Sequence, residues 1–164
     1  MLTQTQKEVL RLLIEIFNSN NIDFQASGGL AAIAYGAKRP LYDIDIEIYK
    51  KDVETVRELL EPYIVEDWNN DVESSEDSFK LWIMTLSINS VSVDINQVEE
   101  SYVRSQTGEW IHQPETMNIE LRIVGGIEIP VQARADLIAY KHIVGRDTDR
   151  IDIEQMVEAD SITA

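Results

Sequence analysis

Residues 43–49 have the sequence DIDIEIY, in which acidic residues and isoleucines alternate strictly. A period of two places successive side chains on opposite faces of a β-strand. The segment therefore predicts a strand whose isoleucines share one face and whose acids share the other. The acids are Asp43, Asp45 and Glu47. We expect Glu47 to be solvated or to lie just behind the other two.

A glycine pair precedes this strand. Residues 22–26 alternate like a short strand and lead into Ser27-Gly28-Gly29, and the apolar residues 30–35 then indicate a short buried helix. Gly28 and Gly29 permit a close approach of the backbone, and the start of the helix presents free N–H groups. The glycine pair therefore predicts a phosphate-binding turn.

A third acid follows in residues 91–98, where the alternation buries the valines and places Asp94 on the opposite face. If this strand neighbours residues 43–49, Asp94 faces the same side as Asp43 and Asp45. Carboxylates that lie together repel one another unless a cation sits between them, and hard oxygen ligands suit Mg²⁺. Asp43, Asp45 and Asp94 are therefore candidate ligands of a two-metal phosphoryl-transfer site.

The remaining patterns predict an α/β fold in which helices pack on a mixed sheet and a helical pair ends the chain. Residues 5–17 carry one apolar stripe of an amphipathic helix, and residues 66–78 are polar enough to predict a loop. Two dipeptides predict hairpin turns, and two positions predict helix starts. These are Asn89-Ser90 and Gly125-Gly126 for the turns, and Thr5 (with Glu8) and Asp52 for the helix starts.

Length and composition narrow the classes of function. With 164 residues, 44% of them hydrophobic, we expect one domain over residues 1–164. No apolar run approaches the ~18 residues of a membrane span, and the absence of cysteine is compatible with the cytoplasm. The net charge of −16 opposes broad binding to nucleic acid and favours cationic ligands.

The glycine pair, the two acids of the next strand and the later third acid together resemble the motif of the polymerase-beta-like nucleotidyltransferase superfamily. Its pattern is a hydrophobic strand, Gly-Gly or Gly-Ser, a gap of about nine to thirteen residues and then Asp-hydrophobic-Asp. Here thirteen residues separate Gly28-Gly29 from Asp43-Ile44-Asp45, and Val93-Asp94-Ile95 matches the later third acid. The resemblance implies that Asp43 and Asp45 bind both metals, and that Asp94 binds one and helps to deprotonate the attacking hydroxyl.

Two further segments are similar to the small bacterial branch, which includes antibiotic and toxin-type nucleotidyltransferases. Arg39 precedes Asp43 by four residues, where that branch often has Arg-x-Thr-x-Asp, although Leu41 replaces the Thr. Lys141, followed by Arg146-Asp-Thr-Asp149 and Asp152, is similar to the branch's C-terminal pattern, with Thr148 replacing a Lys. The resemblance implies that Arg39 and Lys141 contact the nucleotide. From its position alone, Lys141 is either such a ligand or a lysine that snorkels to the surface.

The function implied is a metal-dependent transfer of a nucleoside monophosphate, AMP from ATP or another NTP, to a hydroxyl of a small acceptor. Two Mg²⁺ ions are the implied cofactors, and the acidic charge suits a cationic acceptor such as an antibiotic. Two alternatives stay open: a toxin-type transferase that modifies a protein or a tRNA end, and a catalytically silent nucleotide- or metal-binding module. A homo-oligomer is compatible with the sequence.

Overall fold

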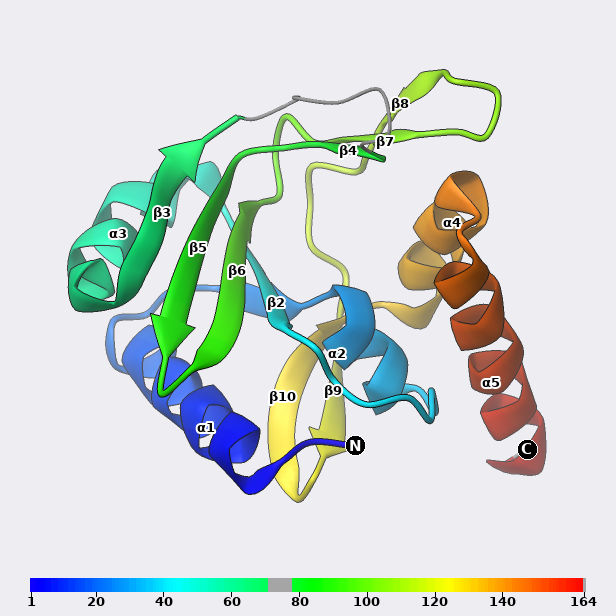
Figure 1. Cartoon of the computed structure of the whole chain (residues 1–164), viewed down its shortest axis with the longest axis horizontal. Helices are drawn as coiled ribbons and strands as arrows, with labels where there is room; N and C mark the ends of the chain where they lie inside the picture. Colours follow the sequence, from blue (N-terminus) through cyan, green and yellow to red (C-terminus); the bar gives the residue numbers. More distant parts are fainter. Residues whose placement is uncertain (71–77, 164) are drawn as a thin grey trace.

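The structure is a computed structural model and describes residues 1–70 and 78–163. Helices, strands and two short 3-10 turns alternate along the chain (Figure 1). The helices are α1 (Gln4–Ser19), α2 (Gly28–Ala34), α3 (Val53–Leu59), α4 (Arg134–Val144) and α5 (Asp147–Thr163). The strands are β1 (Phe24–Ala26), β2 (Ile44–Ile48), β3 (Ile64–Asn69), β4 (Phe79–Lys80), β5 (Ile83–Ile88), β6 (Val91–Gln97), β7 (Tyr102–Arg104), β8 (Trp110–His112), β9 (Ile119–Val124) and β10 (Ile127–Gln132).

The main sheet is mixed, as predicted. Among the described residues it has seven strands in the order β3-β5-β6-β2-β1-β10-β9. The pairs β2–β6 and β1–β10 are parallel, and the other neighbours are antiparallel. Strands β4, β7 and β8 form a separate small sheet near α4 (Figure 1). The C-terminal helical pair is α4 and α5, which pack against each other.

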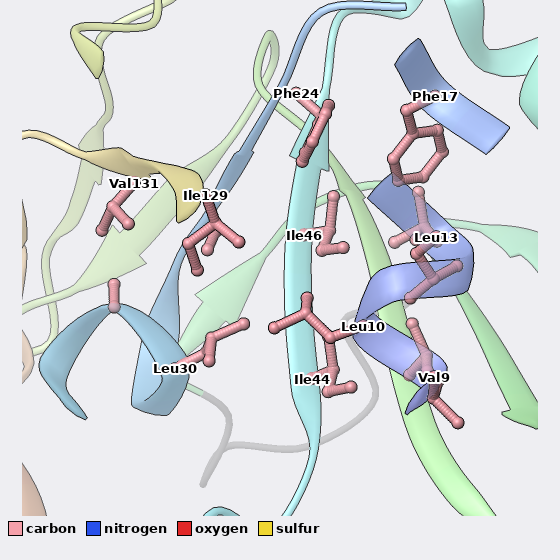
Figure 2. Packing of buried hydrophobic residues seen from close by; sticks show 14 of the residues in the cluster. Val9, Leu10, Leu13, Phe17, Phe24, Leu30, Ile44, Ile46, Ile129 and Val131 are labelled. Atoms are coloured by element: carbon pink, nitrogen blue, oxygen red, sulfur yellow. The ribbon is translucent and has the colours of Figure 1, made fainter. Parts of the chain in front are cut away.

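One face of the main sheet carries the hydrophobic core. Ile44 and Ile46 of β2 point toward Leu10 and Leu13 of α1, and Leu30 of α2 lies beside them (Figure 2). All five side chains are fully buried. The predicted alternation in β2 is therefore confirmed, because its isoleucines enter this core while its acids face the other side of the sheet.

The two predicted hairpins are confirmed, and their turn residues explain them. Asn89 and Ser90 connect β5 to β6 with positive φ at both positions. Gly125 and Gly126 connect β9 to β10 in the same manner. Two-residue loops of this kind match the right-handed twist of the flanking strands.

Three local predictions need correction. The capping box of α1 uses Thr3 and Gln6, not Thr5 and Glu8, because the helix begins two residues earlier. Asp52 precedes α3 as predicted, but its side chain caps nothing because a 3-10 turn leads directly into the helix. Strand β3 (Ile64–Asn69) extends into the predicted loop 66–78 and takes its residues 66–69, and residues 71–77 lie outside the described residues.

Within the described part of the chain, none of the helices combines the length and the apolar character that crossing a membrane requires.

A substitution at Ile46 tests the packing of the hydrophobic core. It lies in the central strand β2 and is almost completely buried between the helices and the sheet. Replacement with alanine should lower the free energy of unfolding by about 2–5 kcal/mol, because the lost contacts leave a cavity. Urea unfolding measures the change. The control is Val65→Ala on β3, where the side chain is 69% exposed and a change below about 0.5 kcal/mol is expected. Equal losses in both variants would contradict the described packing.

Candidate active site

The three acids predicted to act together lie together. Strands β2 and β6 pair in parallel, and their register places Asp45 directly beside Asp94. Asp43 lies just before β2 on the same face. Each of the three carboxylates offers an oxygen atom, and these oxygens lie within 4.8 Å of one another. A cluster of this kind has the donor set that a divalent cation prefers.

The predicted glycine turn lies against this cluster. Gly28 has a φ of +55°, and a Cβ atom at this position would overlap the Oδ2 atom of Asp45. A Cβ atom at Gly29 would lie 2.7 Å from Nη2 of Arg39. The backbone N–H of Ser27 donates to the carbonyl oxygen of Asp45 at 3.0 Å. The turn is therefore held between an acid of the cluster and a cation, and the positive φ of Gly28 favours glycine at that position.

Burial and mutual repulsion shape the protonation of the cluster. Burial is the largest cause that raises the pKa of Asp45 well above its usual value, and the charges of Asp43 and Asp94 raise it further. Burial also raises the pKa of Asp94, although the Thr85 hydroxyl opposes this by donating to Oδ1 at 2.9 Å. The cluster therefore carries unfavourable negative charge that a bound cation would neutralise.

A chain of alternating charges, which we call the buried ion network, joins the loop after α2 to helices α4 and α5. Arg39 makes two hydrogen bonds to Asp152, at 2.9 and 3.1 Å. The ammonium of Lys141 bridges Asp149 at 3.1 Å and Asp152 at 3.0 Å. Arg146 completes the chain by bonding Asp149 at 2.8 and 3.1 Å. Both aspartate side chains are 0% exposed.

The network excludes one of the two interpretations of Lys141, that of a lysine that snorkels to the surface. Its side chain is 1% exposed and does not snorkel to the surface, because two buried carboxylates hold the ammonium inside. Burial alone would raise the pKa of Asp149, but Arg146 and Lys141 together hold it below its usual value. Three cations thus face two anions, and the surplus positive charge lies beside the acid cluster.

Glu47 lies in the wall of the cavity and is partly exposed there. Burial raises its pKa to about 7, while hydrogen bonds from Ser27 and Gln25 act in the opposite direction. Nε2 of Gln25 lies 3.5 Å from its Oε2 atom. The sequence placed Glu47 on the correct face, but the neighbouring strands that bury it could not be seen from β2 alone.

A cavity of about 490 Å³ lies at the centre of these groups. The acid cluster, the glycine turn, Arg39 and Lys141 line it, so the structure brings every candidate site residue to one cavity. Its walls also include aromatic side chains from the small sheet and α4. These are Phe79, Tyr102 and Tyr140.

Sequence reasoning missed a set of amides in the same cavity. The side-chain oxygens of Gln25, Asn96 and Gln132 are buried and have no hydrogen-bond partner among the described residues. Asn96 could have been found, because it follows Asp94 by two residues on the same strand face. Gln25 and Gln132 come from β1 and β10, which are distant in sequence and adjacent in the sheet. A buried carbonyl oxygen without a donor is costly, so each of the three is an unusual feature of the cavity wall.

Comparison with solved structures supports the fold. A Thermotoga maritima protein assigned as a nucleotidyltransferase, TM1012, has a TM-score of 0.64 and 18% identity, over 94% of this chain and 96% of that chain. The lincosamide antibiotic adenylyltransferase LnuA, solved with lincomycin, has a TM-score of 0.59 and 17% identity, over 96% and 98% of the two chains. ANT(2'')-Ia, solved with adenylyl-2''-tobramycin, has a TM-score of 0.60 and 14% identity, over 98% and 91%. At these identities the likeness establishes the fold.

The sequence comparison identifies the family. No curated protein sequence matches the chain significantly. Residues 9–156 match the family described as aminoglycoside-2''-adenylyltransferase, which covers most of the chain. The resemblance to small bacterial nucleotidyltransferases is therefore confirmed. The chain belongs to the aminoglycoside-2''-adenylyltransferase family and is a nucleotidyltransferase.

Proposed function

We propose that residues 1–164 act as one unit that transfers AMP from ATP to a hydroxyl group of a small cationic antibiotic and releases pyrophosphate. The observation that carries the proposal is the cluster of Asp43, Asp45 and Asp94 beside the glycine turn, in the wall of a cavity that unpaired amide side chains also line. The family and the antibiotic adenylyltransferases of the same fold support this choice of substrates. A location in the cytoplasm stays a prediction.

The acid cluster fits divalent cations, because its oxygens converge and because its charge is poorly compensated without one. We propose that Asp43, Asp45 and Asp94 hold Mg²⁺, two ions in all. Bound there, Mg²⁺ supplies charge neutralisation for the phosphate oxygens during transfer. The positive φ of Gly28 lets the turn approach the Asp45 carboxylate closely, and both glycines line the cavity, so phosphate bound at the turn would lie beside the acid cluster.

Asp94 is the best-placed proton acceptor. Its Oδ1 atom accepts a hydrogen bond from Thr85, which orients the carboxylate. The carboxylate belongs to the acid cluster and lines the cavity, so it is positioned to accept the proton of a hydroxyl bound there. The proton of the acceptor hydroxyl moves to Asp94 as the oxygen bonds to the α-phosphorus and pyrophosphate departs.

The buried ion network supplies the positive side of the site. Arg39 borders the glycine turn and lines the cavity, so it suits the nucleotide phosphates. The ammonium of Lys141 already has two carboxylate partners. We propose that Lys141 acts on the nucleotide chiefly by holding the network, and with it Arg39, in place.

We propose that the acceptor binds beside the unpaired amide side chains. Gln25 and Asn96 flank Glu47 in the sheet and Gln132 lies on β10, and their amide oxygens can accept hydrogen bonds from hydroxyl or ammonium groups. An acceptor rich in such donors would satisfy every one of these groups at once. This chemistry describes an aminoglycoside better than an apolar molecule.

Loss of one metal ligand should stop the reaction. Asp43→Asn and Asp45→Asn should each lower turnover at least about a hundredfold, because the phosphate charge is then left unneutralised. Mass spectrometry of the adenylylated product from tobramycin and ATP, with lincomycin as a second acceptor, measures the effect. The matched control is the exposed acid Asp23, whose Asp23→Asn variant should keep full activity. Either active-site variant retaining more than a few per cent of turnover would refute the assignment.

The acid cluster also predicts how the stability of the protein depends on pH and on Mg²⁺. Because the pKa of Asp45 is raised in the fold, its charge costs stability as the pH rises through that pKa. In EDTA at neutral pH, Asp45→Asn should therefore be more stable than the wild type by roughly 0.5–2 kcal/mol, and the difference should shrink as the pH falls. Mg²⁺ should stabilise the wild type, by ~2.7 kcal/mol at about 100 times its dissociation constant, and should hardly affect the variant. Thermal melts decide this, and an equal metal-dependent shift in both proteins would place the metal elsewhere.

The acceptor site can be tested separately from the nucleotide site. Gln132→Leu removes an unpaired buried oxygen and keeps the volume, so the fold should not lose stability. The KM for tobramycin should rise about tenfold or more, while the KM for ATP stays within about twofold. Steady-state kinetics with each substrate varied in turn gives both values. Gln4→Leu on the outer surface of α1 is the control, and a rise of the ATP KM alone would contradict the placement of the acceptor.

A further inference from the structure

Strand β9 is an unusual sheet edge. It ends the main sheet, and among the described residues no strand pairs with its outer side. Three apolar side chains stand exposed along one of its faces: Ile119 is 44% exposed, Leu121 66% and Ile123 70%. They lie on the face of the sheet opposite the core, because their paired residues on β10 are Gln132, Pro130 and Glu128. A row of apolar side chains beside unpaired backbone groups invites another strand.

The opposite edge of the same sheet shows how an edge is normally protected. Strand β3 pairs with β5 through two shifts of register, and it carries Glu66 and Asp67 in its middle. Irregularities and charges of this kind prevent a further strand from adding. Strand β9 instead keeps one continuous register with β10 over all six of its residues. Of the two edges, only β9 is built to accept a partner.

The hairpin determines which backbone groups of β9 are free. In a two-residue hairpin the residues that flank the turn, here Val124 and Ile127, form a hydrogen-bonded pair. Bonding then alternates along the strand, so the amides of even-numbered residues face β10. The carbonyl oxygen of Asn118 accepts a hydrogen bond from the N–H of Ala133 at 2.7 Å, which fits this alternation. The free N–H and C=O groups therefore belong to the same residues that carry the exposed apolar side chains.

The side chains of β9 are complementary to a reversed copy of themselves. Residues 119–123 have the sequence IELRI, with Leu121 at the centre. Two antiparallel copies centred on Leu121 place Glu120 opposite Arg122 of the second copy, and Ile119 opposite Ile123. The central pair and the two Ile119–Ile123 pairs are then the hydrogen-bonded ones, which uses every free backbone group in the segment and forms about six hydrogen bonds. Both charges and hydrogen bonds match in one register.

We propose that a second copy of this chain binds here: two molecules join β9 to β9 in antiparallel order about a two-fold axis at Leu121, and the two main sheets become one continuous sheet. This interface is isologous, as expected for a symmetric homodimer. It buries the apolar side chains on one face and forms two Glu120–Arg122 pairs on the other. The pairing is independent of the proposed reaction, since none of its residues belongs to the acid cluster or the ion network.

The charged residues of this segment also have roles within one molecule. The Tyr35 hydroxyl donates to Oε2 of Glu120 at 2.7 Å, and the guanidinium of Arg122 lies 5.0 Å from the centre of the Tyr35 ring. Tyr35 thus holds both side chains in place on the core side of β9 before a partner arrives. Such preorganisation lowers the entropy lost on association.

Cysteine cross-linking tests the register, because the natural chain has no cysteine that could react in the background. In the proposed dimer the two Leu121 Cα atoms are about 5.5 Å apart, within the range of a disulfide. The two Ile123 Cα atoms are four residue steps apart, about 13 Å, which is too far. With oxidised glutathione, Leu121→Cys should form a covalent dimer at least about ten times faster than Ile123→Cys, a matched control on the same face of the same strand.

Sedimentation of the uncross-linked proteins completes the test. The wild type should change from 18.7 kDa toward twice that mass as its concentration rises to about 100 μM. Arg122→Glu should weaken the dimer at least about tenfold, and the swap Glu120→Arg with Arg122→Glu should restore it, because the opposed charges again differ in sign. Val65→Lys on β3 should have no effect. A monomer at every concentration, equal cross-linking of the two cysteine variants, or a dimer unaffected by Arg122→Glu would each overturn the proposal.

Discussion

The parallel pairing of β2 with β6 is the constraint on which the rest of the molecule depends. Its register sets Asp45 beside Asp94 on one face and Ile46 beside Ile95 on the other. The same backbone contact therefore builds the core and the acid cluster. The strands are held in the centre of the sheet by the burial of the isoleucine face, which supplies the free energy that keeps three mutually repelling carboxylates close together.

The buried ion network places positive charge next to the acid cluster in a chain whose net charge is −16. Asp149 and Asp152 lie one helical turn apart on α5 and are completely buried, so they require cationic partners. Lys141, Arg39 and Arg146 meet that requirement from α4, the loop after α2 and the residue just before α5. A change at either aspartate would leave the buried Lys141 ammonium with one carboxylate partner, and its effect would reach both the packing of α5 and the phosphate side of the site.

The cavity and the sheet edge illustrate two ways in which unsatisfied groups reveal a function. Within the cavity, three buried amide oxygens lack donors, and the energetic cost of that state points to a ligand that supplies them. At β9 the unsatisfied groups are the backbone of an edge strand, which water can solvate, so the exposed apolar side chains and the charge pattern are the informative features. The first identifies a small molecule rich in hydrogen-bond donors, and the second identifies another copy of the strand.

The sequence by itself determined the periodic and local features. The alternation of residues 43–49 and 91–98 predicted the strands and the face that carries the three acids, and the dipeptides predicted both hairpins. The family followed from the resemblance of the glycine and acid motif to a known one. These inferences succeeded because each depends on a short segment whose side-chain directions follow from backbone geometry. The predictions of the start of α1 and of a loop where β3 lies were wrong, because several overlapping patterns satisfy the same local rules there and packing selects among them. Only the tertiary structure decided the partners of Lys141, the environment of Glu47 and the presence of Gln25, Asn96 and Gln132 in one cavity, because strand order and helix docking bring together residues that share no periodic signal along the chain.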